Sequence, residues 1–318
     1  MTQRGTGHSG APVVSFEGVS KVYGQVRAVD GLSLELRPSE TVAFLGPNGA
    51  GKSTSLDMLL ALRKPTSGRI RVFGEEPYAS VKSGRIGAML QSGGLMPEVT
   101  VREMVDLVAR IHPRPLPVEQ TLRRAGIADL ADRRVDRLSG GQTQRARFAL
   151  AIAGECDLIV LDEPTTAMDV ESRQGFWANM HAEVAQGRTL LFATHYLEEA
   201  DQAADRILVI NKGRLLADGT PAEIKQRAGA KRISFRLATV DEPFLLGLPA
   251  LVNLEVRNDL VNLQSSDSDR TLYALLDAGY RPREIEISGL GLEQAFLAIT
   301  AEDDKNIIAD EHEKETVR

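Results

Sequence analysis

Apolar and polar residues alternate along the first part of the chain, in VVSFEGVSKVY, which begins at Val13, and in LSLELR, which includes Leu36. Alternation with a period of two is typical of strands that bury one face. We therefore expect a small antiparallel sheet over residues 13–36, with turns at Gly24 and Gly31.

Later apolar runs do not alternate: TVAFLG, RIGAMLQ, DLIVLDE and TLLFAT. Short unbroken apolar runs favour strands buried on both faces. Between these runs the apolar residues have helical spacing. The helical segments follow TVAFLG, cover residues 101–136 apart from HPRPLP, begin again at LSGGQ, and lie near residues 170–186. Buried strands that alternate with helices predict an α/β domain with a parallel sheet. The last segment, DRILVINKGRLLADG, predicts a hairpin that turns at Lys212 and Gly213.

The pattern changes at KQRAGAKR, and shorter elements follow. We expect strands near residues 233–237, 251–256 and 260–264, a helix near 269–278, a strand at EIEI, and an amphipathic helix in GLEQAFLAIT. These elements predict a separate small α+β domain over residues 231–300. Residues 1–12 and the charged tail 301–318 are expected to be disordered.

Composition narrows the function classes. The 318 residues carry 38 Lys and Arg against 44 Asp and Glu, a net charge of -6, which argues against a broad nucleic-acid footprint. The single cysteine, Cys156, lies in an apolar stretch, so we expect a buried thiol and no disulfide. The sequence has no signal-peptide pattern and no apolar run of about 18 residues, so no membrane span is expected.

The segment FLGPNGAGKST supplies the first chemical motif, because G-x-x-x-x-G-K-S between a strand and a helix is a P-loop. Its glycines let backbone N–H groups cradle phosphates, its lysine reaches the β- and γ-phosphates, and Ser53 binds Mg²⁺. The alternative is a glycine-rich turn without a ligand. The expected nucleotide-binding residues are Gly46, Pro47, Asn48, Gly49, Ala50, Gly51, Lys52, Ser53 and Thr54.

Two adjacent carboxylates, Asp162 and Glu163, end the buried strand of DLIVLDEP. Ligands of open α/β sheets bind at the carboxyl ends of strands, so Asp162 is expected to help hold Mg²⁺ and Glu163 to polarise an attacking water. By itself the pair could also be an ordinary acidic turn.

A second anion site is predicted at LSGGQTQR, where a helix begins with a serine and two glycines. The alternative is a helix N-cap with a flexible lead-in. One nucleotide does not need two phosphate cradles from one subunit. With this motif the chain resembles the ATP-binding subunits of ABC transporters, in which the signature residues clamp ATP held by the opposite subunit. The residues that match the signature are Ser139, Gly140, Gly141 and Gln142.

Further positions match this family in order along the chain. The resemblance implies that Tyr23 stacks on adenine, that Gln91 contacts Mg²⁺ or its water and links ATP to the membrane partner, and that Asp169 belongs to the D-loop. His195 matches the switch histidine that contacts the γ-phosphate and, with Lys52 and Glu163, completes the expected catalytic set. Tyr23 could instead pack in its sheet, and isolated Gln91 or His195 would be ordinary polar surface residues.

The resemblance covers most of residues 13–228, the expected ABC nucleotide-binding domain, and implies a RecA-like core with an antiparallel β subdomain and an inserted helical subdomain. VTVREM, THYLEEADQAADRI and LEQAFLAIT resemble ABC-2-type exporters of the daunorubicin-resistance and sodium-extrusion branches. This implies an ATPase that uses ATP and Mg²⁺, forms a head-to-tail homodimer and drives export of a drug, lipid or other amphiphile. Its expected place is the cytoplasmic face of the membrane, on a separate permease.

Two other functions are compatible with the same motifs: the ATPase of an ABC importer, and a soluble ABC ATPase that acts on nucleic acid or ribosomes. The second class usually has a long coiled coil between the motifs or two cassettes in one chain. Here the segment from Gln91 to Leu138 is short and a single cassette is present, so no nucleic-acid partner is expected.

Overall fold

A computed structural model describes residues 11–91, 93–227 and 229–301. The chain divides into two compact units between Asp218 and Gly219. The predicted domain boundaries, residues 13–228 and 231–300, stay a prediction. The N-terminal segment up to residue 10 and the tail from residue 302, for which we predicted disorder, lie outside the described residues, whereas Ala301 is helical.

The first sheet of unit 1 is antiparallel, as its alternating pattern predicted, with the order β2-β1-β4. Its strands are β1 (Val14–Tyr23), β2 (Val26–Leu36) and β4 (Ser67–Val72). The expected turn at Gly24 joins β1 to β2, but the expected turn at Gly31 is wrong. Gly31 lies inside β2, where the register with β1 shifts, and its N–H donates to Ser20 Oγ at 2.9 Å. Its φ of 65° suits glycine, so the residue serves a bulge and not a chain reversal.

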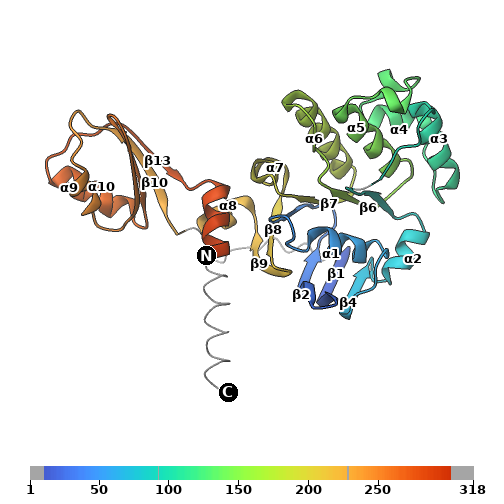
Figure 1. Cartoon of the computed structure of the whole chain (residues 1–318), viewed down its shortest axis with the longest axis horizontal. Helices are drawn as coiled ribbons and strands as arrows, with labels where there is room; N and C mark the ends of the chain where they lie inside the picture. Colours follow the sequence, from blue (N-terminus) through green and yellow to red (C-terminus); the bar gives the residue numbers. More distant parts are fainter. Residues whose placement is uncertain (1–10, 92, 228, 302–318) are drawn as a thin grey trace, which may run out of the picture. The chain divides into compact units, whose positions relative to one another are not determined.

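The second sheet has six strands in the order β5-β6-β7-β3-β8-β9. Figure 1 labels four of them, β6, β7, β8 and β9. They are β3 (Thr41–Leu45), β5 (Ile86–Met89), β6 (Leu158–Asp162), β7 (Thr189–Thr194), β8 (Arg206–Asn211) and β9 (Arg214–Gly219). The pairs among β3, β5, β6, β7 and β8 are parallel. Strands β3, β6 and β7 are buried at every residue, in agreement with their unbroken apolar sequences.

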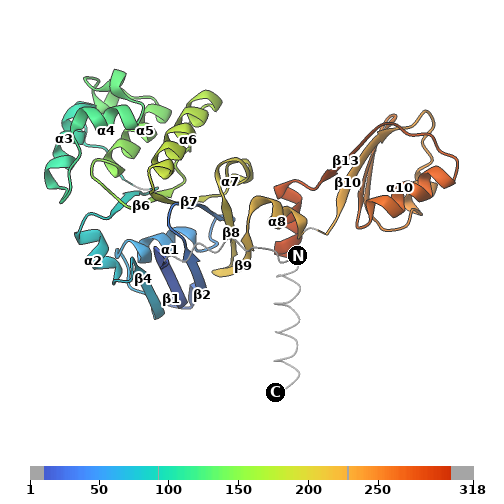
Figure 2. The same ribbon diagram turned by 180° about the vertical axis from the view of Figure 1, so that it is seen from behind.

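Helices occupy the connections between these strands. They are α1 (Lys52–Leu59), α2 (Pro77–Lys82), α3 (Val101–Ile111), α4 (Val118–Arg124), α5 (Gly140–Ala151), α6 (Val170–Ala185) and α7 (Leu197–Ala203). Helices α3, α4 and α5 contact one another between β5 and β6 and form the inserted helical part, which Figures 1 and 2 show as one group. Short 3₁₀ turns at Ala128–Leu130 and Val135–Arg137 lead into α5.

One apolar core joins the two sheets of unit 1. It contains Phe16 and Val72 from the antiparallel sheet, Leu56 and Leu59 from α1, and Val160 from β6. Helix α1 therefore lies between the sheets, and the loop that precedes it is held from both sides. At the far edge of the parallel sheet, the β8–β9 hairpin turns at Lys212 and Gly213 as predicted.

The second unit begins with α8 (Pro221–Gln226) and is built around a sheet in the order β11-β12-β10-β13. The strands are β10 (Lys231–Arg236), β11 (Leu251–Arg257), β12 (Leu260–Ser265) and β13 (Arg283–Gly289), with α9 (Glu242–Leu246) and α10 (Ser268–Asp277) between them. All described pairings in this sheet are antiparallel. The chain order β-α-β-β-α-β with this strand order is a ferredoxin-like arrangement. Residues 292–301 form a final helix.

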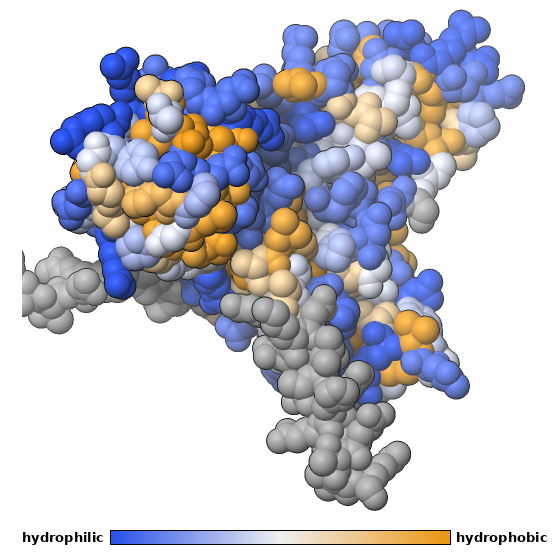
Figure 3. Space-filling view, turned by 60° about the vertical axis from the view of Figure 1, so that its left-hand side comes forward, coloured by the Kyte–Doolittle hydropathy of each residue, from blue (hydrophilic) through white to orange (hydrophobic). Residues whose placement is uncertain are grey.

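The core of this unit lies on one face of its sheet. Ile233, Phe235, Val261 and Leu263 point to that face and pack with Leu275 of α10. In Figure 3, the visible surface of the protein carries apolar groups in orange among hydrophilic groups in blue. Among the described residues, no helix has the length and apolar character needed to span a membrane.

Candidate functional site: a nucleotide-binding cleft

Strand order brings the predicted site residues to one edge of the six-stranded sheet. The P-loop follows β3, His195 follows β7, and Asp162 and Glu163 lie at the end of β6. Because β3 pairs with β7 and β7 with β6, all in parallel, their carboxyl ends lie side by side. The edge where ligands bind in open α/β sheets therefore carries three of the predicted motifs.

Close packing explains two of the P-loop glycines. A Cβ on Gly46 would lie 2.2 Å from the Ile210 carbonyl oxygen of β8, and one on Gly51 would lie 2.4 Å from the Ala28 carbonyl oxygen of β2. Gly51 also has φ of 100°. The loop is thus confined between two strands with a backbone that only glycine adopts readily. Gly51 caps α1 without a side-chain hydrogen bond, so the first N–H groups of this helix are available to an anion.

Lys52 extends from α1 into this loop and is only 6% exposed. Its Nζ donates to the carbonyl oxygens of Gly46 at 2.7 Å and Pro47 at 3.1 Å. Burial lowers the pKa of Lys52, and the Glu163 and Asp162 carboxylates oppose this change. The ammonium group therefore sits in the concave side of the loop, next to acidic groups.

Asp162 is 3% exposed, and its Oδ1 has no hydrogen-bond partner among the described residues. Burial raises the pKa of Asp162, the nearby Ser53 hydroxyl lowers it, and the Glu163 charge raises it further. A buried carboxylate oxygen without a partner is costly unless something binds it. Asp162 and Ser53 are thus oxygen donors of the kind that Mg²⁺ prefers.

Glu163 and His195 form a direct pair across neighbouring strand ends. His195 Nδ1 lies 2.7 Å from Glu163 Oε1, and Thr166 Oγ1 lies 3.5 Å from Glu163 Oε2. Glu163 has φ of 49°, in the left-handed region that a non-glycine residue rarely adopts. Its backbone N–H donates to the Ala193 carbonyl oxygen at 2.9 Å, which holds this conformation. Strain held in place by neighbouring structure is a frequent feature of functional sites.

A cleft of about 450 Å³ connects several of these residues. The P-loop from Asn48 to Thr54 forms one wall, and Tyr23, Gln91 and Glu163 also line the cleft. Tyr23 is 39% exposed at the end of β1, with Lys21 Nζ 5.1 Å from the centre of its ring. This exposure argues against the alternative that Tyr23 only packs inside its sheet.

The predicted signature residues form a separate site. Ser139 caps α5 in a capping box, in which its Oγ accepts from the Gln142 N–H at 3.3 Å and Gln142 Oε1 accepts from the Ser139 N–H at 3.0 Å. A Cβ on Gly140 would lie 3.1 Å from Cβ of Ala167, so the helix start packs on the segment before Asp169. Asp169 caps α6 by accepting from the Ser172 N–H at 2.7 Å. Among the described residues, those that line the P-loop cleft do not include Ser139, Gly140, Gly141, Gln142 or Asp169.

Comparison with known proteins agrees with this arrangement. The ABC transporter family model matches residues 29–166. The daunorubicin resistance ATP-binding protein DrrA3 of Streptomyces coeruleorubidus is 33% identical over 304 residues, which cover 91% of this chain and 96% of that protein. The chain belongs to the ABC transporter ATP-binding family.

Other relatives place it near ABC-2-type exporter ATPases. The Nod factor export ATP-binding protein I of Paraburkholderia xenovorans is 38% identical over 66% of this chain and 72% of that protein. A solved ATP-binding cassette, a dimer in a post-hydrolysis state with ADP and Pi, superposes with a TM-score of 0.60 at 25% identity, over 65% of this chain and 98% of that one. These likenesses confirm the α/β cassette fold that the motifs predicted.

Two parts of this ABC ATPase site were not predicted from the sequence. Ala28 of β2 lines the cleft, although it belongs to no motif. The second part is Glu199 on α7, which is 4% exposed. It accepts a hydrogen bond at 2.8 Å from Oγ1 of Thr194, the residue directly before His195. Helical spacing from His195 could have indicated which of the two glutamates in YLEEAD faces inward. The buried hydrogen bond between Glu199 and the residue before His195 became visible only in the structure.

Proposed function

We propose that this chain is the ATP-hydrolysing subunit of an ABC exporter. The observation that carries the proposal is the Glu163–His195 pair at 2.7 Å, on strand ends adjacent to the P-loop. A nucleotide-binding turn alone needs no such carboxylate. An ATPase needs one that is held beside the transferred phosphoryl group.

In the proposed reaction, the P-loop N–H groups and Lys52 bind the phosphates and stabilise charge that develops on them. The oxygen of the attacking water bonds to the γ-phosphorus while Glu163 accepts a proton from this water. In the same step, the bond between the γ-phosphorus and the ADP oxygen breaks. His195 holds the γ-phosphate and, through Nδ1, orients Glu163. The products are ADP and inorganic phosphate, so the step is balanced without a further reactant.

Mg²⁺ fits the oxygen donors of the cleft, since Ser53 offers a hydroxyl and Asp162 has an unpartnered buried oxygen. Among the described residues, no group of three or more His, Cys, Asp or Glu side chains could hold a metal by itself. This suits an ion bound by few protein ligands together with substrate phosphates. When bound, Mg²⁺ would neutralise charge on the β- and γ-phosphates. Gln91, which lines the same cleft, is the further proposed ligand.

The proposed assembly is a head-to-tail homodimer that closes over two ATP molecules. Its support is that Ser139 lies at an exposed helix start, whereas the P-loop cleft of the same chain is formed by other residues. Each ATP would then lie between the P-loop of one subunit and the signature of the other. The solved dimeric cassette with ADP and Pi is consistent with this assembly.

Export, a separate membrane permease and a place on the cytoplasmic face of the membrane are proposed from the relatives. These are described as a daunorubicin resistance protein and as Nod factor export proteins. The expected cargo class is a drug, lipid or other amphiphile. An importer ATPase or a soluble ATPase remains the alternative to be tested.

The decisive experiment compares the wild-type chain with Glu163→Gln. This change keeps the shape and removes the charge, so ATP should still bind while turnover falls by about 10²- to 10⁴-fold. Glu171→Gln, an exposed acid on α6, is the control and should retain wild-type turnover. Hydrolysis at the wild-type rate in Glu163→Gln would remove Glu163 from the mechanism. Cells that produce the chain with its permease should export a test amphiphile, and the variant should not. Uptake in place of export would support the importer alternative.

A further inference from the structure

The sheet of the ferredoxin-like unit has a second face, opposite to the one that packs on the apolar core. Residues of β10 and β12 alternate between the faces, so Arg232, Ser234, Asn262 and Gln264 lie opposite to the apolar core formed by Ile233 and its neighbours. Strand pairing places Asn253, Gln264, Arg232 and Ser288 in one row across the sheet. The adjacent row consists of Glu255, Asn262, Ser234 and Glu286. Charged and amide side chains therefore occupy this face.

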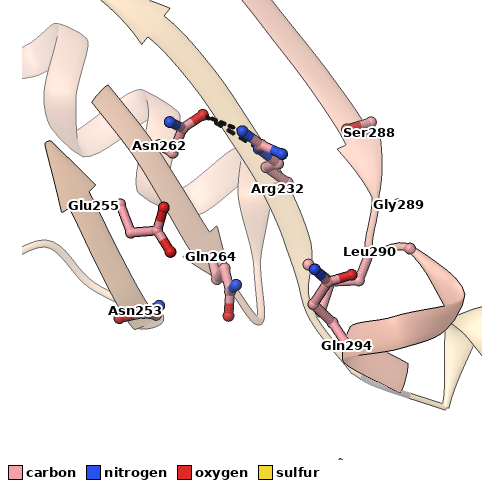
Figure 4. Close-up of a pocket in the computed structure, with 10 residues that line it drawn as sticks. Arg232, Asn253, Glu255, Asn262, Gln264, Ser288, Gly289, Leu290 and Gln294 are labelled. Atoms are coloured by element: carbon pink, nitrogen blue, oxygen red, sulfur yellow. Dashed lines mark hydrogen bonds between the residues drawn. The ribbon is translucent and has the colours of Figure 1, made fainter. Parts of the chain in front are cut away.

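A cavity of about 280 Å³ lies on this face (Figure 4). Arg232, Asn253, Glu255, Asn262 and Gln264 line it from three strands, and Gln294 lines it from the final helix. Figure 4 shows Glu255 and Arg232 on either side of the strand that carries Gln264. The volume is just below the roughly 300 Å³ at which pockets for drug-sized ligands begin, so the cavity suits a smaller molecule.

Arg232 is held toward this cavity by a neutral partner. Its Nε and Nη2 donate to Asn262 Oδ1 at 3.2 Å and 2.7 Å. On the same strand, Arg236 instead donates to carboxylates, at 2.9 Å to Asp259 and at 2.9 Å to Glu284. An amide orients the guanidinium group without neutralising it, so the positive charge of Arg232 stays available to an anionic group.

Glu255 supplies the opposite charge. Among the described residues, neither Arg232 nor Glu255 has an oppositely charged partner within 4.0 Å. Because β12 lies between their strands, the two backbones are about 10 Å apart. One small molecule with a positive and a negative group could therefore contact both side chains, while the amides of Asn253, Gln264 and Gln294 accept or donate between them.

We propose that this cavity binds a small zwitterion of the amino-acid class. Its carboxylate pairs with Arg232 and its ammonium with Glu255. Among the lining residues, none is aromatic, which disfavours a stacked nucleobase or sugar ring as the ligand. The proposal concerns the second unit and is independent of ATP hydrolysis in the first.

The test is isothermal titration calorimetry of the full chain with the standard amino acids and glycylglycine. At least one probe should bind in the millimolar range or tighter. Amidation of that probe removes its negative charge and acetylation of its amine removes its positive charge, so each change should weaken binding. A hydrogen-bonded charge contact corresponds to roughly tenfold to hundredfold in affinity.

Arg232→Gln and Glu255→Gln assign the two contacts. Arg232→Gln should weaken binding roughly tenfold to hundredfold. It should also remove the preference for the free acid of the probe over its amide. Glu255→Gln should remove the preference for the free amine over its acetylated form. The matched controls are Arg257→Gln on β11 and Glu286→Gln on β13, which are exposed positions on the same sheet face but do not line the cavity, and they should bind as wild type.

Circular dichroism and melting curves show whether each variant folds. Arg232→Lys is a second variant that keeps the charge and should restore part of the affinity. Failure of every amino-acid probe to bind the wild-type chain would overturn the proposal. So would binding that both charge-removing variants leave unchanged, or binding of glucose or inorganic phosphate to these residues with no amino acid bound.

Discussion

At the scale of single residues, burial decides the chemistry of Cys156. Its side chain is 3% exposed, and burial raises the pKa of the thiol from 9.0 to about 11. Only the thiolate reacts, so the native protein should react with a thiol reagent at pH 8 at least about a hundredfold more slowly than the unfolded chain. The release of chromophore from a disulfide reagent, with and without urea, measures this difference.

The signal is unambiguous because the chain contains one cysteine. Rapid labelling of the native protein would contradict the burial of Cys156.

The same pKa difference has a consequence for stability. The unfolded thiol ionises first, so the thiol favours the folded state below pH 9.0, and this contribution is lost as pH rises from 9.0 to about 11.

At the scale of secondary-structure elements, a buried ion cluster joins the inserted helices to the sheet core. Glu183 of α6 is 2% exposed and accepts from Arg124 Nε of α4 at 2.8 Å. Arg188, which precedes β7, contacts the same carboxylate at 3.0 Å. Removing the carboxylate in Glu183→Ala leaves two guanidinium groups partly buried without it, so we expect a loss of about 3–5 kcal/mol in the free energy of unfolding.

Urea unfolding followed by circular dichroism gives this free energy. Glu171→Ala lies in the first turn of the same helix, where an exposed acidic charge interacts with the helix dipole, so this control should cost less than about 1 kcal/mol. Equal losses in the two variants would show that the cluster does not stabilise the junction of α4, α6 and β7.

At the scale of the whole molecule, the position of Ser139 outside the P-loop cleft makes the proposed dimer testable. Lys52→Ala and Ser139→Arg should each abolish hydrolysis when alone, because every site of either homodimer contains one defect. In a mixed dimer, one site combines an intact Lys52 with an intact Ser139. Random mixing should therefore recover about a quarter of wild-type ATPase activity if the sites act independently.

A second mixture controls for effects other than site sharing. Lys52 and Glu163 line the same cleft, so Lys52→Ala mixed with Glu163→Gln leaves no intact site and should recover nothing. ATPase activity is measured in each unfractionated 1:1 mixture, and pull-down through a tag on one variant confirms that heterodimers form. Equal activity in the two mixtures, or none in the first despite heterodimer formation, would contradict a composite site.

The sequence by itself determined the features that depend on neighbours along the chain. The unbroken apolar runs predicted β3, β5, β6 and β7. The segment LSGGQ predicted the start of α5, which Ser139 caps. The spacing G-x-x-x-x-G-K-S also predicted the glycine-rich loop between β3 and α1. These features are local because strand burial, helix caps and glycine loops follow from composition over a few residues.

The tertiary structure decided what depends on distant partners. The turn expected at Gly31 is a bulge because β1 pairs with β2 on both sides of it. The contact of Glu163 with His195 requires β6 and β7 to be neighbours, and no local pattern contains strand order. Likewise, α9 was not predicted, because a helix of five residues has little periodicity, yet it completes the ferredoxin-like unit. Only the pairing of β10, β11 and β12 brings Arg232 and Glu255 to one cavity, since residues far apart in sequence become adjacent through the sheet.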